Sequence, residues 1–237
     1  MNLPEYNINN FYPHEKAIIC GKRLTGKTTL VNKLIENICD NRQIQHLYLI
    51  VSNKSLNQFN ITNHSKLQNK TTHYFNINKF IIKTINSECN KNDGEKIIVV
   101  DDIIISSNIL KDLIKIEATI IMSCQYFVYY YTSLFNTFIF TQENSIINKQ
   151  NIYNLAQKSF VGHKHMSNFD NFKKLFDHNT SNYNAMVISK FKLLRINTKF
   201  FYSKNKSLNK DYISEPVNNI FNKITKPKFN TPIEIII

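Results

Sequence analysis

The sequence predicts an α/β fold in which helices cover both faces of a central, mostly parallel sheet. Short apolar runs of strand length alternate along the chain with longer segments that have the helical period. The short runs are apolar at nearly every position, which is typical of parallel strands buried on both faces. Of the 237 residues, 42% are hydrophobic and only 20% are charged, so the chain can fill a sizeable core.

The first half of the chain is predicted to open with a strand, a tight loop and a helix. Residues 16–20 (KAIIC) form a short apolar run, and residues 21–28 form the loop. Residues 29–39 are expected to be helical because their apolar side chains recur every three or four positions: Leu30, Val31, Leu34, Ile35 and Ile38. The other elements expected here are strands at 46–51, 72–75 and 96–100 and a helix at 78–89.

The second half continues the alternation of strands and helices. The elements expected there are helices at 107–116, 146–158 and 168–176 and strands at 119–123, 137–140, 183–189 and 193–201. Residues 1–201 are predicted to form the folded core. Residues 202–237 are rich in Lys and Asn and hold three of the five prolines, so they are predicted to form a basic C-terminal extension.

The charge of the chain suits a polyanionic partner. There are 30 Lys and Arg residues against 17 Asp and Glu residues, a formal net charge of +13. Lysines near phosphates gain free energy by releasing counterions, so double-stranded DNA is a fitting partner. An Asn-, Ile- and Lys-rich composition is also typical of an AT-rich genome, which would supply part of this charge. The charge is therefore supporting evidence only.

The cysteines and the apolar runs indicate an intracellular protein. None of the four cysteines has the C-x-x-C spacing of a metal or redox motif. The chain shows no secretory signal, and its longest apolar runs are shorter than the about 20 residues of a membrane span. We therefore expect a protein that is not secreted and has no membrane partner.

The loop at residues 21–28 (GKRLTGKT) is a complete G-x-x-x-x-G-K-[ST] phosphate-binding motif between a predicted strand and a predicted helix. Backbone amides of such a loop surround the phosphates of ATP. Lys27 is expected to contact the β- and γ-phosphates as a catalytic residue, and the Thr28 hydroxyl is expected to bind Mg²⁺. The predicted nucleotide-binding residues are Gly21, Lys22, Arg23, Leu24, Thr25, Gly26, Lys27, Thr28 and Thr29.

An acidic pair ends the apolar run at residues 96–102 (KIIVVDD), as in a Walker B strand. Ligands bind at the carboxyl ends of strands in open α/β sheets, so both carboxylates are expected at the same edge as the loop. Asp101 is expected to hold Mg²⁺ through water, and Asp102 to orient or deprotonate the attacking water. The alternative is that the pair only caps the following helix.

A further strand, at residues 119–123, follows the acidic pair and is succeeded by Gln125. In the additional-strand, RecA-like class of P-loop NTPases, this later strand lies between the strands of the two motifs. Gln125 would then face the γ-phosphate as a catalytic sensor. A solvated Gln in a loop is the alternative interpretation.

This order of features resembles the DNA-packaging ATPases of poxviruses, other large DNA viruses and virophages, in the FtsK/HerA-like branch of P-loop motors. The resemblance covers about residues 11–192 and rests on GKRLTGKT, KIIVVDD, TIIMSCQ, TFIF and NYNAMVIS. It implies a homo-oligomeric ring of five or six subunits that translocates double-stranded DNA into a capsid. It further implies a capsid or portal-region protein as a partner, and a location at the virus assembly site in the host cell and in the virion.

The resemblance also assigns roles to residues and shows one departure. By it, Lys27 and Thr28 bind the nucleotide and Mg²⁺, Asp101 and Asp102 are the acidic pair, and Gln125 is the sensor. Family members often carry an Arg finger shortly after the Gln strand, but residues 126–136 (YFVYYYTSLFN) hold neither Arg nor Lys. The candidates left for a cation acting on a neighbouring subunit are Lys115, Arg23 and Arg195.

Two other functions remain open from the sequence. The first is a small-molecule kinase for nucleosides or nucleotides, which would share the loop but usually has an Arg-rich lid; this chain has only three arginines. The second is a nucleotide-binding, capsid-associated protein that has lost motor activity, which the missing Arg favours. The aromatic run at 126–131 is expected to be part of one helix, with a contact to DNA or a neighbouring subunit as the alternative. His163 and His165 are not expected to bind a metal ion, because no Cys or acidic residue accompanies them, and the sequence assigns no role to Gly162.

Overall fold

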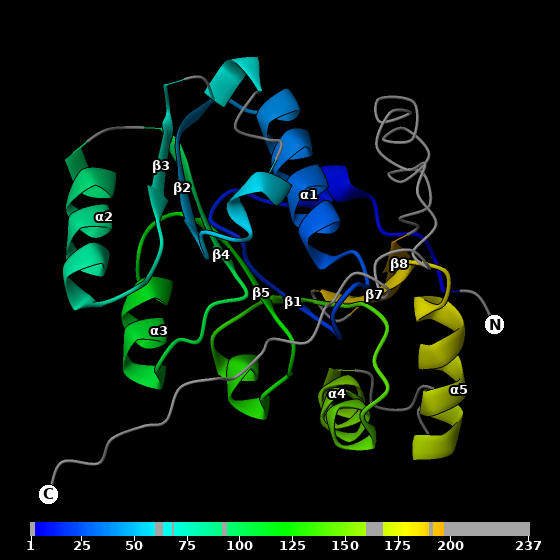
Figure 1. Ribbon diagram of the computed structural model, residues 1–237. Coiled ribbons are helices and arrows are strands. Elements are labelled where there is room, and N and C mark those ends of the chain that lie inside the picture. Colours follow the sequence, from blue (N-terminus) through cyan, green and yellow to red (C-terminus); the bar gives the residue numbers. More distant parts are fainter. Residues whose placement is uncertain are drawn as a thin grey trace, which may run out of the picture. The chain divides into compact units, whose positions relative to one another are not determined.

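The computed structural model describes residues 3–59, 64–67, 69–91, 94–159, 168–189 and 192–196. Within them, eight strands form one sheet (Figure 1). The strands are β1 (Lys16–Cys20), β2 (Ile44–Val51), β3 (Thr71–Tyr74), β4 (Glu95–Asp101), β5 (Thr119–Cys124), β6 (Thr137–Phe140), β7 (Ala185–Ser189) and β8 (Lys192–Ile196). Their order across the sheet is β3-β2-β4-β5-β1-β6-β7-β8.

The sheet is mostly parallel, as the sequence predicted. The six strands from β3 to β6 run parallel to one another. The last two pairs, β6 with β7 and β7 with β8, are antiparallel. The strand β5 lies between β4 and β1, so the carboxyl ends of the acidic strand, the Gln strand and the loop strand are adjacent.

Helices cover both faces of the sheet, which confirms the predicted layers. The α-helices are α1 (Lys27–Asn41), α2 (Lys79–Lys91), α3 (Ser107–Ile114), α4 (Ile146–Ser159) and α5 (Phe169–Thr180). Short 3-10 helices are η1 (Ile8–Asn10), η2 (Leu56–Gln58), η4 (Ser65–Leu67) and η5 (Tyr129–Ser133). None of the helices among the described residues is both long enough and apolar enough to span a membrane.

The core consists of two clusters, one on each face of the sheet. Alternate strand residues belong to different clusters: Ile19 packs with the apolar face of α1, whereas Ile18 packs with residues of α2, α3, α4 and α5. Figure 1 shows α1 on one side of the strands and α2, α3 and α4 on the other. Because the strands are buried on both sides, they carry the continuous apolar runs seen in the sequence.

The structure differs from the sequence predictions at several boundaries. The helix α1 begins at Lys27, two residues earlier than predicted, and α5 extends to Thr180. The aromatic run was wrongly expected to be part of one helix, because only the short η5 forms there. The strand predicted at 193–201 is described only to Ile196. Residues 160–167, with Gly162 and the two histidines, and the proposed extension 202–237 lie outside the described residues.

Candidate functional site

The loop begins at Gly21, where the chain passes between two neighbouring strands. A Cβ atom at this position would lie 1.9 Å from the Thr141 Oγ1 atom, so any residue other than glycine would require Thr141 to move. The Gly21 amide donates to the Cys124 carbonyl at 3.3 Å, at the end of β5. The next amide, of Lys22, donates to the Gln142 carbonyl at 3.2 Å, just beyond β6. Strands on both sides of β1 therefore fix the start of the loop.

The loop ends at Gly26, which caps α1 in the left-handed conformation with a φ of +86°. This conformation is unfavourable for other L-residues and explains the second glycine of the motif. The first amides of a helix have no acceptor within the helix, and their partial positive charge attracts phosphate. Leu24, at the tip of the loop, also has a positive φ of +62° and is 95% exposed. The loop is thus open to solvent, and the N-terminus of α1 that follows it is suited to bind an anion.

The side chain of Lys27 folds back onto the phosphate-binding loop. Its Nζ atom donates to the Gly21 and Lys22 carbonyls, both at 2.8 Å. Its side chain is almost fully buried, and this burial lowers the pKa of Lys27, while the Asp102 and Asp101 carboxylates oppose the shift. A lysine that is held by loop carbonyls at a helix N-terminus can turn toward a phosphate that is bound by the first amides of that helix.

Asp101 meets the loop from the end of β4. Its Oδ2 atom accepts from the Thr28 hydroxyl at 3.2 Å, and its Oδ1 atom accepts from the Ser123 hydroxyl. Burial raises the pKa of Asp101 above the usual range, while these two hydroxyl bonds oppose the shift by stabilising the carboxylate. The structure therefore brings together the two residues predicted to hold a metal ion.

Asp102 lies just after β4 in a different environment from Asp101. It is exposed and has a φ of +53°, a left-handed conformation that Asp tolerates better than most residues. Its amide donates to the Ser123 carbonyl at 3.3 Å. Its two carboxylate oxygens accept from the Gln125 Nε2 atom at 2.9 and 3.2 Å. Asp102 and Gln125, the predicted catalytic residues that directly follow β4 and β5, are therefore in direct contact.

Two hydroxyl residues that were not predicted from the sequence support the site. Ser123 holds Asp101, and the Thr141 Oγ1 atom lies 2.6 Å from the Thr25 Oγ1 atom beneath the loop. Thr25 also donates to the Lys22 carbonyl at 2.8 Å. Both Ser123 and Thr141 lie at the carboxyl end of an apolar run of strand length. A polar residue in that position is typical of a ligand-binding site in an α/β sheet, and it could have indicated both residues from the sequence.

The remaining predicted residues are placed as follows. Thr29 is half-buried in the first turn of α1, and Arg23 is exposed in the loop. Lys115 is exposed and lies 3.6 Å from Asp112, a neighbour along the same helix end. Arg195 belongs to β8, but its side chain is outside the described part of the structure. Neither Arg23 nor Lys115 is shown in contact with Gln125 or the acidic pair within the described residues.

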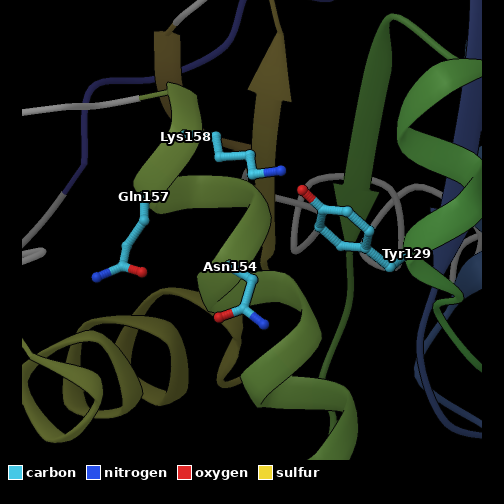
Figure 2. A pocket seen from close by; sticks show the side chains of 4 residues that line it. All are labelled: Tyr129, Asn154, Gln157 and Lys158. Atoms are coloured by element: carbon cyan, nitrogen blue, oxygen red, sulfur yellow. The ribbon is translucent and has the colours of Figure 1, made fainter.

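A separate hollow of about 440 Å³ lies between η5 and the end of α4. Figure 2 shows the four residues that line it, Tyr129, Asn154, Gln157 and Lys158. The Lys158 Nζ atom lies 4.8 Å from the centre of the Tyr129 ring, a cation–π contact (Figure 2). The hollow contains no residue of the loop or the acidic pair, so it is distinct from the predicted nucleotide site.

The donor set of the site fits Mg²⁺ bound together with a nucleotide. The Thr28 hydroxyl and the Asp101 carboxylate are hard oxygen ligands. No group of three or more His, Cys, Asp or Glu residues among the described residues could hold a metal ion. Mg²⁺ typically takes one or two carboxylates and completes its shell with water and substrate phosphates. A loop that can hold the nucleotide phosphates, together with one hydroxyl and one carboxylate, therefore meets the needs of such an ion.

Known proteins match the chain only partly in sequence. No family model matches it. An uncharacterised protein of Acanthamoeba polyphaga mimivirus is 33% identical over 142 residues, which are 54% of this chain and 55% of that protein. The chain therefore spans about half the length of this curated relative.

Solved structures show which fold the chain shares. The DNA-packaging ATPase of Sulfolobus turreted icosahedral virus matches with a TM-score of 0.53 at 11% identity, over 78% of this chain and 98% of that protein. The genome packaging NTPase of Sulfolobus turreted icosahedral virus 2, in complex with AMPPCP, matches with a TM-score of 0.54 at 10% identity, over 78% and 97%. The chain has the fold of these viral packaging NTPases.

Proposed function

We propose that this chain is a P-loop ATPase of the additional-strand, RecA-like type that hydrolyses ATP to move viral double-stranded DNA into a capsid. The fold supports this proposal, because viral genome-packaging NTPases share it. The order of the site residues along the chain supports it independently, since it matches the FtsK/HerA-like branch named above.

The observation that carries the proposal is the position of β5 between β1 and β4. This position brings Gln125 within 2.9 Å of Asp102, beside a complete phosphate-binding loop. A small-molecule kinase needs the loop, but the contact between Gln125 and an acidic residue at the neighbouring strand end suits the control of an attacking water. Hydrolysis is therefore favoured over phosphate transfer to a small molecule.

Each side chain of the site has a distinct role in the proposed reaction. Lys27 would stabilise negative charge on the β- and γ-phosphates, and Thr28 and Asp101 would hold Mg²⁺. Bound Mg²⁺ supplies positive charge that neutralises the phosphates. Asp102 would orient the attacking water or accept its proton, and Gln125 would pass the state of the γ-phosphate to Asp102 through the bond between them.

The proposed partners follow from charge and from the shared fold. The net charge of +13 favours association with double-stranded DNA. We further propose a ring of five or six copies, a capsid or portal-region partner and action at the virus assembly site. Arg23, Lys115 and Arg195 are the proposed sources of a cation for a neighbouring subunit, since residues 126–136 hold none.

Steady-state ATP hydrolysis tests the proposal. The full chain with Mg²⁺ is expected to hydrolyse ATP faster when double-stranded DNA is added, and the stimulation is expected to fall as salt rises. Lys27→Ala should abolish turnover, whereas Lys83→Ala, at an exposed position of α2, should not. Absence of DNA stimulation together with a monomeric state would overturn the motor proposal.

The same assay separates the two alternative functions. Transfer of the γ-phosphate to a nucleoside or nucleotide would show a kinase. Tight binding of ATP with hydrolysis at the background rate of Lys27→Ala would show a nucleotide-binding protein without motor activity. Both outcomes contradict the proposed function.

A further inference from the structure

Two of the four cysteines lie side by side at the base of the site. Cys20 is the last residue of β1, Cys124 is the last residue of β5, and the two are register partners in neighbouring parallel strands. Their Sγ atoms are 3.2 Å apart, and both thiols are free. The other two cysteines, Cys39 and Cys89, belong to α1 and α2 and show no such pairing in the described structure.

The geometry of this pair suits a disulfide. Register partners on neighbouring strands lie about 4.8 Å apart, which is within the Cα separation of natural disulfides. Side chains at paired positions point to the same face, and both cysteines pack against the same core cluster. A disulfide bond of about 2.05 Å requires the two sulfurs to approach by only about 1 Å. The backbone can therefore keep its strand pairing when the bond forms.

The two thiols differ in how an oxidant reaches them. Cys124 is half-exposed, whereas Cys20 is only 2% exposed. Burial raises the pKa of the Cys20 thiol, and hydrogen bonding to Cys124 raises it further. Cys124 is thus the thiol that meets a small oxidant first, and Cys20 is the resolving thiol beside it.

We propose that Cys20 and Cys124 are a reversible redox site, oxidised to a disulfide by hydrogen peroxide, and that this disulfide suppresses the turnover of the site. The Cys124 thiolate attacks one peroxide oxygen and the O–O bond breaks, which gives a sulfenic acid and a hydroxide; the hydroxide takes up the proton that the Cys124 thiol released and becomes water. The Cys20 sulfur then attacks the Cys124 sulfur. The S–O bond breaks, and the hydroxide leaves as water with the Cys20 proton. Two thiols and one peroxide give one disulfide and two waters, and a small thiol reverses the reaction.

The disulfide is expected to suppress turnover because each cysteine directly precedes a residue of the site. Cys20 precedes Gly21, the first residue of the loop, and Cys124 precedes Gln125. The Gly21 amide already bonds the Cys124 carbonyl, so the loop and the Gln strand meet at this pair. The strands keep their pairing, but the bond moves the Cys20 and Cys124 side chains toward each other directly beside Gly21 and Gln125. A misplacement of about 1 Å in a site can cost up to about 100-fold in rate. This part of the inference rests on the proposed ATPase function.

Mass spectrometry tests the disulfide without any reference to activity. After treatment with peroxide, the full chain is expected to lose about 2 Da, and trypsin should release residues 17–22 joined to residues 116–149. Cys39→Ala/Cys89→Ala keeps the pair and should give the same result. Cys124→Ser should prevent it. A loss of 2 Da that persists in Cys124→Ser, or oxidation of Cys124 without the joined peptides, would overturn the inference.

Turnover tests the regulatory part separately. The ratio of the rates before and after peroxide is expected to be about tenfold or more for the wild type and for Cys39→Ala/Cys89→Ala. The ratio should be near one for Cys124→Ser, and dithiothreitol should restore the oxidised wild type. A joined peptide with an unchanged rate would overturn the regulatory part. If the reduced protein hydrolyses no ATP, the proposed function fails while the mass result still decides the disulfide.

Discussion

Two segments flank the ends of β1 and β5, and they contribute very differently to the site. The loop at residues 21–28 is fixed by backbone hydrogen bonds to Cys124 and Gln142, and its own carbonyls accept from Lys27. The segment at residues 126–136 is aromatic, and its first ring, Tyr126, is 66% exposed. The loop contains cationic side chains and lies at a helix N-terminus, whereas the segment at residues 126–136 contains neither Lys nor Arg.

This difference shows which part of the proposed reaction one chain can perform alone. In the proposed reaction, the loop, Thr28 and Asp101 would bind the nucleotide with its metal ion. A cation on the far side of the γ-phosphate, which speeds hydrolysis in related chemistry, is missing from the segment after Gln125. We therefore expect nucleotide binding to be a property of the single chain and rapid turnover to require a neighbouring copy.

The largest expected effect is on the loop itself. Lys27→Ala removes the charge that the loop carbonyls hold, so ATP binding should weaken and turnover should fall by about 100-fold or more. Isothermal titration with ATP and Mg²⁺, with Lys83→Ala as the matched control, measures this. Normal ATP binding by Lys27→Ala would show that the nucleotide binds elsewhere.

The next effect concerns the Gln strand. Gln125→Ala removes the donor to both oxygens of Asp102, so turnover is expected to fall about 10- to 100-fold while ATP affinity stays unchanged. Gln157→Ala, in the separate hollow, is the control and should change neither quantity. A loss of ATP affinity in Gln125→Ala would mean that this residue serves binding and not catalysis.

A smaller effect is expected from the hydroxyl that supports Asp101. Burial already raises the pKa of Asp101, and Ser123→Ala removes a donor that stabilises the charged form, so the pKa should rise further. As the pH falls, Asp101 then becomes neutral earlier and loses Mg²⁺. The acid side of the pH profile of Mg²⁺-dependent turnover should move to higher pH by about one unit.

The sign of this shift distinguishes a metal ligand from a structural residue. Ser133→Ala, which removes a donor to the Tyr130 carbonyl, should leave the profile in place. A shift of the Ser123→Ala profile to lower pH would contradict the assignment of Asp101.

The smallest effect is expected from an exposed charge. Arg23→Ala should lower DNA-stimulated turnover by about threefold at low salt, because exposed charges contribute under about 1 kcal/mol and are screened. ATP binding by the single chain should not change. Lys115→Ala should have less effect, since Lys115 already lies near Asp112. A loss of turnover of about 1,000-fold in either variant would instead identify that residue as the cation that acts on a neighbouring subunit. Such a catalytic cation raises the hydrolysis rate by roughly that factor or more.

The sequence was most informative where one residue type alone can fill a position. The strand Lys16–Cys20 was predicted with its observed bounds, and Gly21 and Gly26 proved to be where a side chain would clash or a left-handed φ is needed. The contacts of Thr141 and Ser123 were not predictable. They depend on which strands become neighbours in the sheet, and local patterns do not contain that information.

The segment after Gln125 was the least predictable part of the site. Its aromatic residues suggested a helix, but tertiary packing decided otherwise. Phe127 is buried against Phe138 and Phe140 with edge-to-face ring contacts, and only the short η5 forms after it. Packing of this kind overrides local propensity.

Displacement of a DNA third strand tests the central claim most directly. A triplex-forming strand is annealed to a long double-stranded DNA, and the full chain is added with Mg²⁺ and either ATP or a non-hydrolysable analogue. A translocating ATPase should release the third strand with ATP, and Lys27→Ala or the analogue should release none. Release that is equal with ATP and the analogue, or no release by a protein that hydrolyses ATP, would contradict the proposed translocase.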